Sequence, residues 1–353
     1  MKKLVAAMLI LAVTMSAAGC KGSDADKENS TQAAGAQSDG TEAQEGQSSG
    51  TKAEYTLKIG SSVAENDPVT RGLWRFEEIV EEKTGGSLQV EIYPASQLGA
   101  DEDLIEQATM GTGVGLITDA GRLGTYVNEY GILGAPYLVD NYEEALKLLE
   151  TTVYDGMIED LASHGLRVLS GNWYAGTRQL FMKQEVKAPA DLKGLRVRSS
   201  GSAIVSSTIG AMGADPTVLP WSESYSGLQQ KVIDGLEAHY SAAVGSSIYE
   251  VSSYLCKTGH FQHILNLVIS ESWFRSLPEE YRQILLDAAY EGGTAASEET
   301  LEKDAEYEKT LTENGMTIVE VDVEAFKAAT DQVYDELNLR DLKDQIDKEL
   351  GKN

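Results

Sequence analysis

Apolar and polar residues change their spacing repeatedly along the chain after residue 54. Tyr55, Leu57 and Ile59 alternate with polar residues, which is the two-residue period of a half-buried strand. Asp67 and Pro68 then favour a helix start, and an apolar stripe follows them. The same patterns predict strands over residues 88–92, 114–118 and 167–173, and helices over 101–110 and, in two pieces, 141–164. This order predicts an α/β domain with a mainly parallel sheet.

A second unit with shorter strands follows. We expect strands over residues 179–183, 195–198, 217–219, 236–240 and 261–269, and helices over 202–212 and 222–232. One helical pattern then runs from 278 to 314, and Gly292 and Gly293 interrupt it, so we expect a bend there. At about 1.5 Å per residue this helix exceeds the width of one domain, so it should cross between two. A strand over 317–321 and an amphipathic helix over 323–337 come last.

The first 53 residues have the pattern of a targeting signal and a tether. Two lysines precede an apolar run over residues 4–18, which is shorter than the roughly 20 residues of a spanning helix. Small residues and Cys20 end this run, as in a bacterial lipoprotein signal, although Ala17 replaces the usual Leu; an ordinary secretory peptide is the alternative. We expect residues 1–19 to be a signal peptide and Cys20 to be lipidated. Residues 21–53 contain no aliphatic residue larger than Ala, no Met and no aromatic residue, so residues 20–53 should form a disordered tether.

Composition places the rest of the chain among globular proteins and excludes some partners. Hydrophobic residues make up 42% of the 353 residues and charged residues 24%. The 56 acidic residues exceed the 29 basic ones and give a net charge of −27, which argues against nucleic acid or an anionic membrane surface as a partner. A local arginine pair can still bind an anionic ligand. Because Cys20 is expected to carry lipid, Cys256 has no partner for a disulfide within the chain, and its role stays open.

Five motifs in a fixed order carry a family resemblance. They are YPASQLG at 93–99, GTR at 176–178, PADLKGLRVR at 189–198, GAMGADP with SESYSGLQ over 210–229, and VIDGLE at 232–237. Together they resemble the extracytoplasmic solute receptors of TRAP (tripartite ATP-independent periplasmic) transporters. The resemblance covers about residues 55–340, which is nearly the whole of the expected mature domain.

The resemblance implies a receptor and not an enzyme. Such proteins are two-lobed clamps, each lobe a mixed or parallel sheet flanked by helices, with a long helix crossing both lobes. We expect residues 54–175 with 264–303 to form lobe I, and 176–263 with 304–353 to form lobe II. The clamp closes on a small organic acid and delivers it to TRAP membrane permease subunits, without ATP or another cofactor. The location implied is the outer face of the cytoplasmic membrane, and we expect a lipid-anchored monomer.

Two arginines are the first candidates for ligand binding. Arg198 ends an expected strand, from which it can reach a cleft, and its planar guanidinium can give a carboxylate two parallel hydrogen bonds. The family uses the second basic residue of the PADLKGLRVR run to bind the ligand carboxylate, and that position is Arg198; Arg196 is expected at the surface. From the residues alone, a solvated surface position is the alternative for Arg198. Arg178 matches a supporting arginine of the family, with an interdomain ion pair as its alternative.

Further candidates lie at strand and helix ends. The family often has an aromatic residue at the position of Trp221, where it packs on the carbon skeleton of the ligand; a core tryptophan is the alternative. Glu223 could hold an arginine in orientation or could simply begin a helix. Ser62 lies after the first expected strand, and Asp119 lies at the end of the strand expected over 114–118. Both residues align with ligand-facing positions of the family, and strand ends are where open α/β sheets bind ligands.

One position departs from the family pattern. After VIDGLE the family commonly has Asn, which here is Ala238, so a ligand identity cannot be transferred from relatives that carry the Asn. We expect His239 or Tyr240 to reach the cleft instead.

Two other functions, metal binding and catalysis, have weaker support in the sequence. Cys256, His260 and His263 are close in sequence, but zinc needs a fuller set of ligands than this segment provides, so we expect no metal. A membrane-tethered enzyme acting on a small carboxylate is the alternative to the receptor. The sequence leaves the ligand open between a C4-dicarboxylate and a sugar acid, although polar candidates slightly favour the sugar acid.

Overall fold

The computed structural model describes residues 53–352. The expected signal peptide, Cys20 and nearly all of the tether lie outside the described residues. No helix of the described chain is long and apolar enough to cross a membrane.

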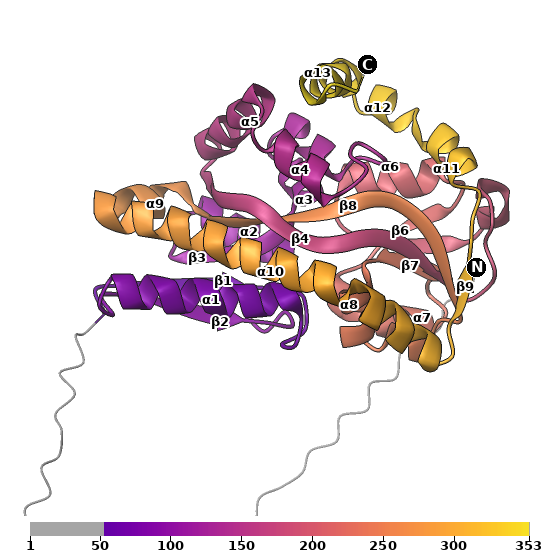
Figure 1. Cartoon of the computed structure of the whole chain (residues 1–353), viewed down its shortest axis with the longest axis horizontal. Helices are drawn as coiled ribbons and strands as arrows, with labels where there is room; N and C mark the ends of the chain where they lie inside the picture. The colour runs from indigo at the N-terminus through magenta and orange to yellow at the C-terminus, as the bar shows by residue number, and fades with distance from the viewer. Residues whose placement is uncertain (1–52, 353) are drawn as a thin grey trace, which may run out of the picture. The chain divides into compact units, whose positions relative to one another are not determined.

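One sheet of nine strands runs through the described chain (Figure 1). The strands are β1 (Tyr55–Gly60), β2 (Leu88–Tyr93), β3 (Val114–Asp119), β4 (Leu166–Met182), β5 (Arg196–Ser199), β6 (Asp215–Val218), β7 (Gly235–Ala238), β8 (Tyr254–Ser270) and β9 (Thr317–Val319). Their order is β2-β1-β3-β8-β4-β7-β5-β6, with β9 beside β8. The two ends of the sheet are parallel, whereas β4 and β8 pair antiparallel to each other and to the strands beside them, apart from the parallel β9. The mixed sheet flanked by helices confirms the expected fold class.

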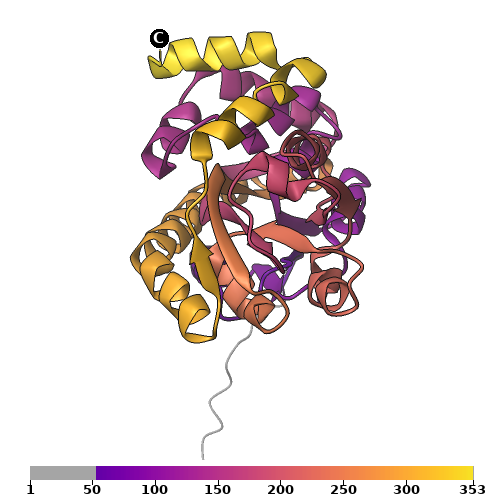
Figure 2. The same ribbon diagram turned by 90° about the vertical axis from the view of Figure 1, so that its right-hand side faces the viewer.

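Thirteen α-helices are described, several of them short. They are α1 (Pro68–Lys83), α2 (Asp101–Thr109), α3 (Ala120–Leu123), α4 (Tyr142–Leu148), α5 (Thr152–Ser163), α6 (Ala203–Ala211), α7 (Ser224–Gln229), α8 (Tyr240–Gly245), α9 (Glu271–Ser276), α10 (Glu279–Glu313), α11 (Val323–Thr330), α12 (Val333–Glu336) and α13 (Arg340–Leu350). Four 3-10 helices join them: η1 (Asn128–Gly134), η2 (Pro189–Leu192), η3 (Trp221–Glu223) and η4 (Ile248–Glu250). Helices α11 to α13 form an outer layer next to α4 and α6 (Figures 1 and 2).

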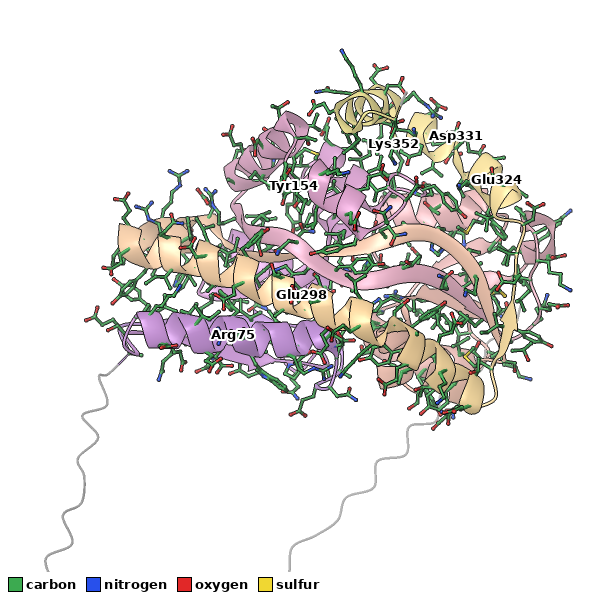
Figure 3. The ribbon with its side chains drawn as sticks, viewed as in Figure 1. Arg75, Tyr154, Glu298, Glu324, Asp331 and Lys352 are labelled. Atoms are coloured by element: carbon green, nitrogen blue, oxygen red, sulfur yellow. The ribbon has the colours of Figure 1, made fainter. Side chains whose placement is uncertain are left out.

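The start of α1 agrees with its sequence pattern. The Asp67 carboxylate caps the helix by accepting a hydrogen bond from the amide of Val69 at 2.9 Å. Leu73, Phe76 and Val80 are fully buried, as expected for an apolar stripe that faces a core. Charged side chains such as Arg75 on α1 and Glu298 on α10 point outward (Figure 3).

The long strand β4 corrects one expectation. We expected two separate strands, 167–173 and 179–183. The structure has one strand of 17 residues that pairs with β8 through several register shifts. Distant partners help to accommodate the polar residues of this strand: the Asn172 side-chain nitrogen donates to the Tyr290 carbonyl at 2.9 Å.

The long helix α10 confirms its expected length and corrects the expected bend. It runs for 35 residues through Gly292 and Gly293 without a break. A Cβ at Gly292 would lie 2.7 Å from the Gly72 carbonyl oxygen of α1, and one at Gly293 would lie 2.5 Å from an oxygen of Asn172. These glycines therefore allow close packing against α1 and β4. The helix also contacts α8, so it spans both halves of the sheet.

Two helical expectations differ in detail, and one further helix is present. The helix expected over 222–232 is reduced to η3 and α7, and the one over 323–337 is divided into α11 and α12. Helix α13 was not expected, although its apolar residue Ile346 is fully buried.

Candidate functional site

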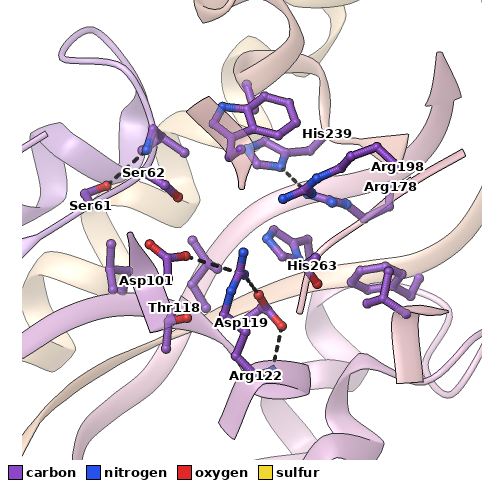
Figure 4. Close-up of a pocket in the computed structure, with 18 residues that line it drawn as sticks. Ser61, Ser62, Asp101, Thr118, Asp119, Arg122, Arg178, Arg198, His239 and His263 are labelled. Atoms are coloured by element: carbon purple, nitrogen blue, oxygen red, sulfur yellow. Dashed lines mark hydrogen bonds and ion pairs between the residues drawn. The ribbon is translucent and has the colours of Figure 1, made fainter. Parts of the chain in front are cut away.

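A cavity lies where strands from both halves of the sheet end (Figure 4). Ser61 and Ser62 follow β1, and Asp119 ends β3. Ser200 follows β5, and His239 follows β7. All five residues line the cavity. The carboxyl ends of parallel strands thus converge on one space, which is where open α/β sheets bind ligands.

Arg198 brings a poorly compensated positive charge into this cavity. Its side chain is 2% exposed, its Nε donates to the Leu219 carbonyl at 2.9 Å, and its Nη1 lies 4.0 Å from the Glu237 carboxylate. Its Nη2 is buried and has no hydrogen-bond partner among residues 53–352. Burial, reinforced by the nearby Arg122, lowers the pKa of Arg198 to about 10, so the group remains charged at neutral pH. A buried cation with an unused donor is suited to a carboxylate ligand.

Arg178 on β4 is held by Glu237 on the adjacent β7. The Glu237 carboxylate accepts hydrogen bonds from Nε and Nη2 of Arg178, and its backbone carbonyl accepts a third from Nη2 at 3.1 Å. Burial raises the pKa of Glu237, but Arg178 and His260 outweigh it and lower the pKa to about 2. The pair is therefore ionised, and Arg178 combines this ion pair, which lies within the expected lobe II, with its place in the cavity wall.

Two histidine rings stack at the cavity wall. The rings of His239 and His263 lie 5.2 Å apart at 25°. Arg178 Nη1 lies 3.4 Å from Nδ1 of His239. Burial, with a further contribution from Arg178, lowers the pKa of His239 to about 3, and the same two causes lower the pKa of His263 well below its usual value. Both imidazoles are therefore neutral at physiological pH.

The opposite wall carries an arginine with three acidic partners. Arg122 on α3 pairs with Asp119, with Glu102 at 2.8 Å and with Asp101 at 3.4 Å. Burial lowers the pKa of Arg122, but Asp119 and Asp101 raise it more. Burial also raises the pKa of Asp101, and the attraction of Arg122 does not fully offset this. The positive charge of Arg122 is thus already compensated, in contrast to that of Arg198.

Trp221 and two hydroxyl groups complete the lining. The Arg198 guanidinium lies 5.5 Å from the Trp221 ring, and the indole nitrogen donates to Ser246 at 3.1 Å. The hydroxyls of Thr118 and Ser200 are buried without a hydrogen-bond partner in the described chain. Unsatisfied polar groups at the cavity wall favour a polar ligand, because leaving them unpaired is costly.

Most of the residues expected from the sequence meet in this cavity. They are Arg198, Arg178, Trp221, Asp119, Ser62 and His239. Glu223 is a correction: it ends η3 with an exposed side chain and does not line the cavity, because the short helix turns it toward solvent. Tyr240 is a second correction, since its hydroxyl donates to Glu308 of α10 at 2.8 Å instead of facing the cavity.

Sequence reasoning missed several lining residues. Arg122 and Asp101 were not candidates, although Arg122 follows the strand-ending Asp119 by three residues, a spacing that could have indicated an ion pair. His263 was considered only as a metal ligand. No group of three or more His, Cys, Asp or Glu residues in the described chain is placed to hold a metal ion. Cys256 is packed in the hydrophobic core, where burial raises its pKa to about 11.

Known proteins are similar to this chain in sequence and in fold. The family model described as "Bacterial extracellular solute-binding protein, family 7" matches residues 59–341. The 2,3-diketo-L-gulonate-binding periplasmic protein of Escherichia coli K12 is 27% identical over 289 residues, covering 81% of this chain and 88% of the relative. A TRAP periplasmic solute binding protein of Escherichia fergusonii, in an apo open structure, is 35% identical with a TM-score of 0.73, covering 83% of this chain and 99% of the other. One from Ochrobacterium anthropi with bound L-fuconate is 32% identical with a TM-score of 0.81, covering 84% and 99%.

Proposed function

The chain belongs to the bacterial extracellular solute-binding protein family 7, the receptors of TRAP transporters, and we propose that its ligand is a sugar acid with one carboxylate and several hydroxyl groups. In this role it delivers the ligand to an ion-driven permease in the membrane. The observation that carries the proposal is that Arg198 lines the cavity while its buried Nη2 has no hydrogen-bond partner in the described chain. A ligand carboxylate would supply that partner, with Arg178 beside it.

The opposite wall favours a sugar acid over a C4-dicarboxylate. Asp101 and Asp119 line it, and their only arginine there, Arg122, is shared among three acidic groups. A second ligand carboxylate would meet these acidic groups without a cation left to pair with it, whereas hydroxyl groups could donate to them. The Escherichia coli and Ochrobacterium anthropi relatives, named for 2,3-diketo-L-gulonate and L-fuconate, support this choice.

A thermal-shift screen tests the ligand class. We expect six-carbon aldonates and uronates to raise the melting temperature of the purified protein, and succinate, malate and fumarate to leave it nearly unchanged. A ligand present at 100 times its Kd stabilises the folded state by about 2.7 kcal/mol, which such a screen detects. If no carboxylate changes the melting temperature, the proposal that the cavity binds a carboxylate is wrong. If succinate stabilises the protein as much as the sugar acids do, the proposal that the ligand is a sugar acid is wrong.

We place the lobe boundary where β4 and β8 cross between the two halves. Lobe I comprises residues 54–175 and 264–303, and lobe II comprises 176–263 and 304–353. Two features support this division: Gly176 has a φ of 117°, and the pairing of β4 with β8 shifts register between Tyr174, paired with Ile264, and Gly176, paired with His263. A backbone irregularity shared by both crossing strands is a suitable hinge for closure.

We further propose that the protein is a monomeric lipoprotein, anchored through Cys20 on the outer face of the cytoplasmic membrane. The amino-terminal sequence pattern is the support for this location. Cys20→Ser should leave the protein in the soluble fraction with its ligand affinity intact. Firm retention of that variant on membranes washed at high salt would contradict the anchor.

Binding without turnover separates a receptor from a tethered enzyme. A sugar acid incubated with a stoichiometric amount of protein and then released by denaturation should be recovered chemically unchanged, as mass spectrometry would show. Chemical conversion of the sugar acid would instead support the alternative that the protein is a membrane-tethered enzyme.

A further inference from the structure

The proposed binding of a carboxylate by Arg198 and Arg178 assigns no role to the two stacked histidines that line the cavity. Nε2 of His239 and Nδ1 of His263 are both buried, both rings line the cavity, and neither atom has a hydrogen-bond partner in residues 53–352. His239 is 2% exposed and His263 7%. Buried ring nitrogens without partners are costly unless a ligand satisfies them.

The contacts of His239 determine which of its nitrogens carries the proton. Arg178 can only donate, so its Nη1, 3.4 Å away, makes Nδ1 of His239 the acceptor. In a neutral imidazole the proton then lies on Nε2, and this buried N–H of a cavity-lining residue has no partner in the described chain. His239 therefore offers a hydrogen-bond donor to the ligand.

His263 is fixed in place by aromatic contacts. Its ring stacks on His239 and meets the ring of Phe261 at 5.5 Å and 71°, so the ring cannot leave the cavity wall without losing both contacts. In the close-up, the two rings lie beside Arg178 and Arg198, on the side of the cavity assigned above to the ligand carboxylate (Figure 4). Groups on the ligand carbons next to that carboxylate would be the ones within reach.

We propose that His239 and His263 select ligands with hydroxyl groups on the carbon atoms adjacent to the carboxylate. This inference rests on the proposed function and narrows it to 2-hydroxy and 2,3-dihydroxy monocarboxylates. A hydroxyl group both donates and accepts, so it matches the donor of His239 and either tautomer of His263. A deoxy analogue would leave buried nitrogens unpaired, and sites of this kind discriminate strongly against such analogues.

The test compares matched ligands and matched variants by calorimetric titration of the purified protein. The probes are D-gluconate, L-galactonate, a 2-deoxyaldonate of six carbons, and hexanoate. We expect the wild-type protein to bind its best aldonate at least tenfold more tightly than the 2-deoxy analogue. His239→Leu and His263→Leu should each weaken aldonate binding by about 5- to 100-fold while changing binding of the unhydroxylated acid less than threefold, because only the hydroxyl contact is lost.

Conservative variants distinguish hydrogen bonding from packing. The amide of Gln can replace Nε2 of a histidine and that of Asn can replace Nδ1, so His239→Gln and His263→Asn should recover most of the selectivity for hydroxylated ligands. His164→Gln is the matched control, because that histidine lies at the end of α5 and does not line the cavity. Equal losses for the aldonate and the unhydroxylated acid in the Leu variants, or unchanged selectivity, would overturn the inference. The proposed function would fail by a different result: the wild-type protein would bind none of the acids.

Discussion

At the scale of single residues, Arg198 combines a buried charge with an incomplete set of partners. Its carboxylate neighbour, Glu237, is already bound to Arg178, and Nη1 of Arg198 approaches it only to 4.0 Å. In the described conformation this charge is desolvated, and a ligand carboxylate would compensate it. Removal of Arg198 should therefore lower ligand affinity much more than it lowers the stability of the ligand-free protein.

Arg198→Ala should weaken binding of the best sugar acid by roughly 10²- to 10³-fold, because loss of one partner of a buried pair costs about 3–5 kcal/mol. The free energy of unfolding without ligand should change much less. Arg198→Lys should also bind poorly, since the two parallel hydrogen bonds are lost. Calorimetric titration and urea denaturation measure both effects.

Arg196→Ala is the matched control for Arg198. Arg196 lies two residues earlier on β5, but its half-exposed side chain pairs with Asp234, away from the cavity. Its removal should leave ligand affinity within a few-fold of the wild type. Similar, small losses for the two alanine variants would show that the carboxylate binds elsewhere.

The buried histidines should make stability depend on pH. The pKa values of His239, His260 and His263 are all lowered from 6.5, mainly by burial, and the charges facing them are Arg178, Arg198, Arg122 and Glu237. Below pH 6.5 the unfolded chain binds protons that the folded protein does not, so stability is present above that pH and is lost as the pH falls toward the folded pKa values. Each histidine contributes a slope of up to about 1.4 kcal/mol per pH unit.

Urea denaturation of the ligand-free protein at pH 7.5 and pH 5.0 measures this effect. The interval lies above the titration of ordinary carboxylates, so the decrease should come mainly from histidines. His263→Asn should reduce the dependence, and His164→Gln should not. Equal stability at the two pH values would contradict the neutral, buried state of these rings.

At the scale of elements, the contact between α1 and α10 depends on glycine. Gly72 and Gly292 approach so closely that a Cβ on either would lie within 2.7 Å of the carbonyl oxygen of the other. A carbonyl oxygen of the backbone cannot move aside as a flexible side chain can. The helix therefore gives up favourable helix propensity at Gly292 to gain close packing.

Gly292→Ala should destabilise the protein by about 1–3 kcal/mol through overpacking, despite the better helix propensity of alanine. Gly156→Ala in α5 is the control, because its added Cβ would meet nothing within 4 Å. The control should stabilise by about 0.5–1 kcal/mol. Thermal denaturation of the two variants measures both effects. If both substitutions stabilise the protein, α1 and α10 can move apart slightly without loss of stability.

At the scale of the whole molecule, the described conformation is closer to a ligand-bound relative than to an open one. The TM-score is 0.81 to the L-fuconate-bound structure and 0.73 to the apo open structure, although the open relative has the higher sequence identity, 35% against 32%. Burial of Arg198, Glu237 and His239 inside the cavity is consistent with a closed clamp. Lobe closure should therefore accompany ligand binding.

Small-angle X-ray scattering should show a larger radius of gyration for the ligand-free protein and a decrease when a saturating sugar acid is added. Arg198→Ala should show little decrease at the same ligand concentration, because it lacks the contact that favours the closed state. An unchanged radius in the wild-type protein under saturating ligand would contradict closure.

The sequence by itself determined the class of protein and much of its local structure. The two-residue and helical periods located β1, α1, β2 and most of α10, because each period reports which face of an element meets the core. The motif around Arg198 indicated the proposed carboxylate-binding position, since that arginine and the strand that carries it are neighbours along the chain. These features depend on local sequence.

Only the tertiary structure decided how the cavity is completed. Arg122 meets Asp101, and His239 stacks on His263, through contacts between segments far enough apart that no local pattern indicates them. The structure likewise joined two expected strands into β4 and turned Glu223 and Tyr240 away from the cavity. The physical reason is shared: the direction of a side chain at the end of a short element, and the partner that satisfies a buried polar group, are set by packing between elements.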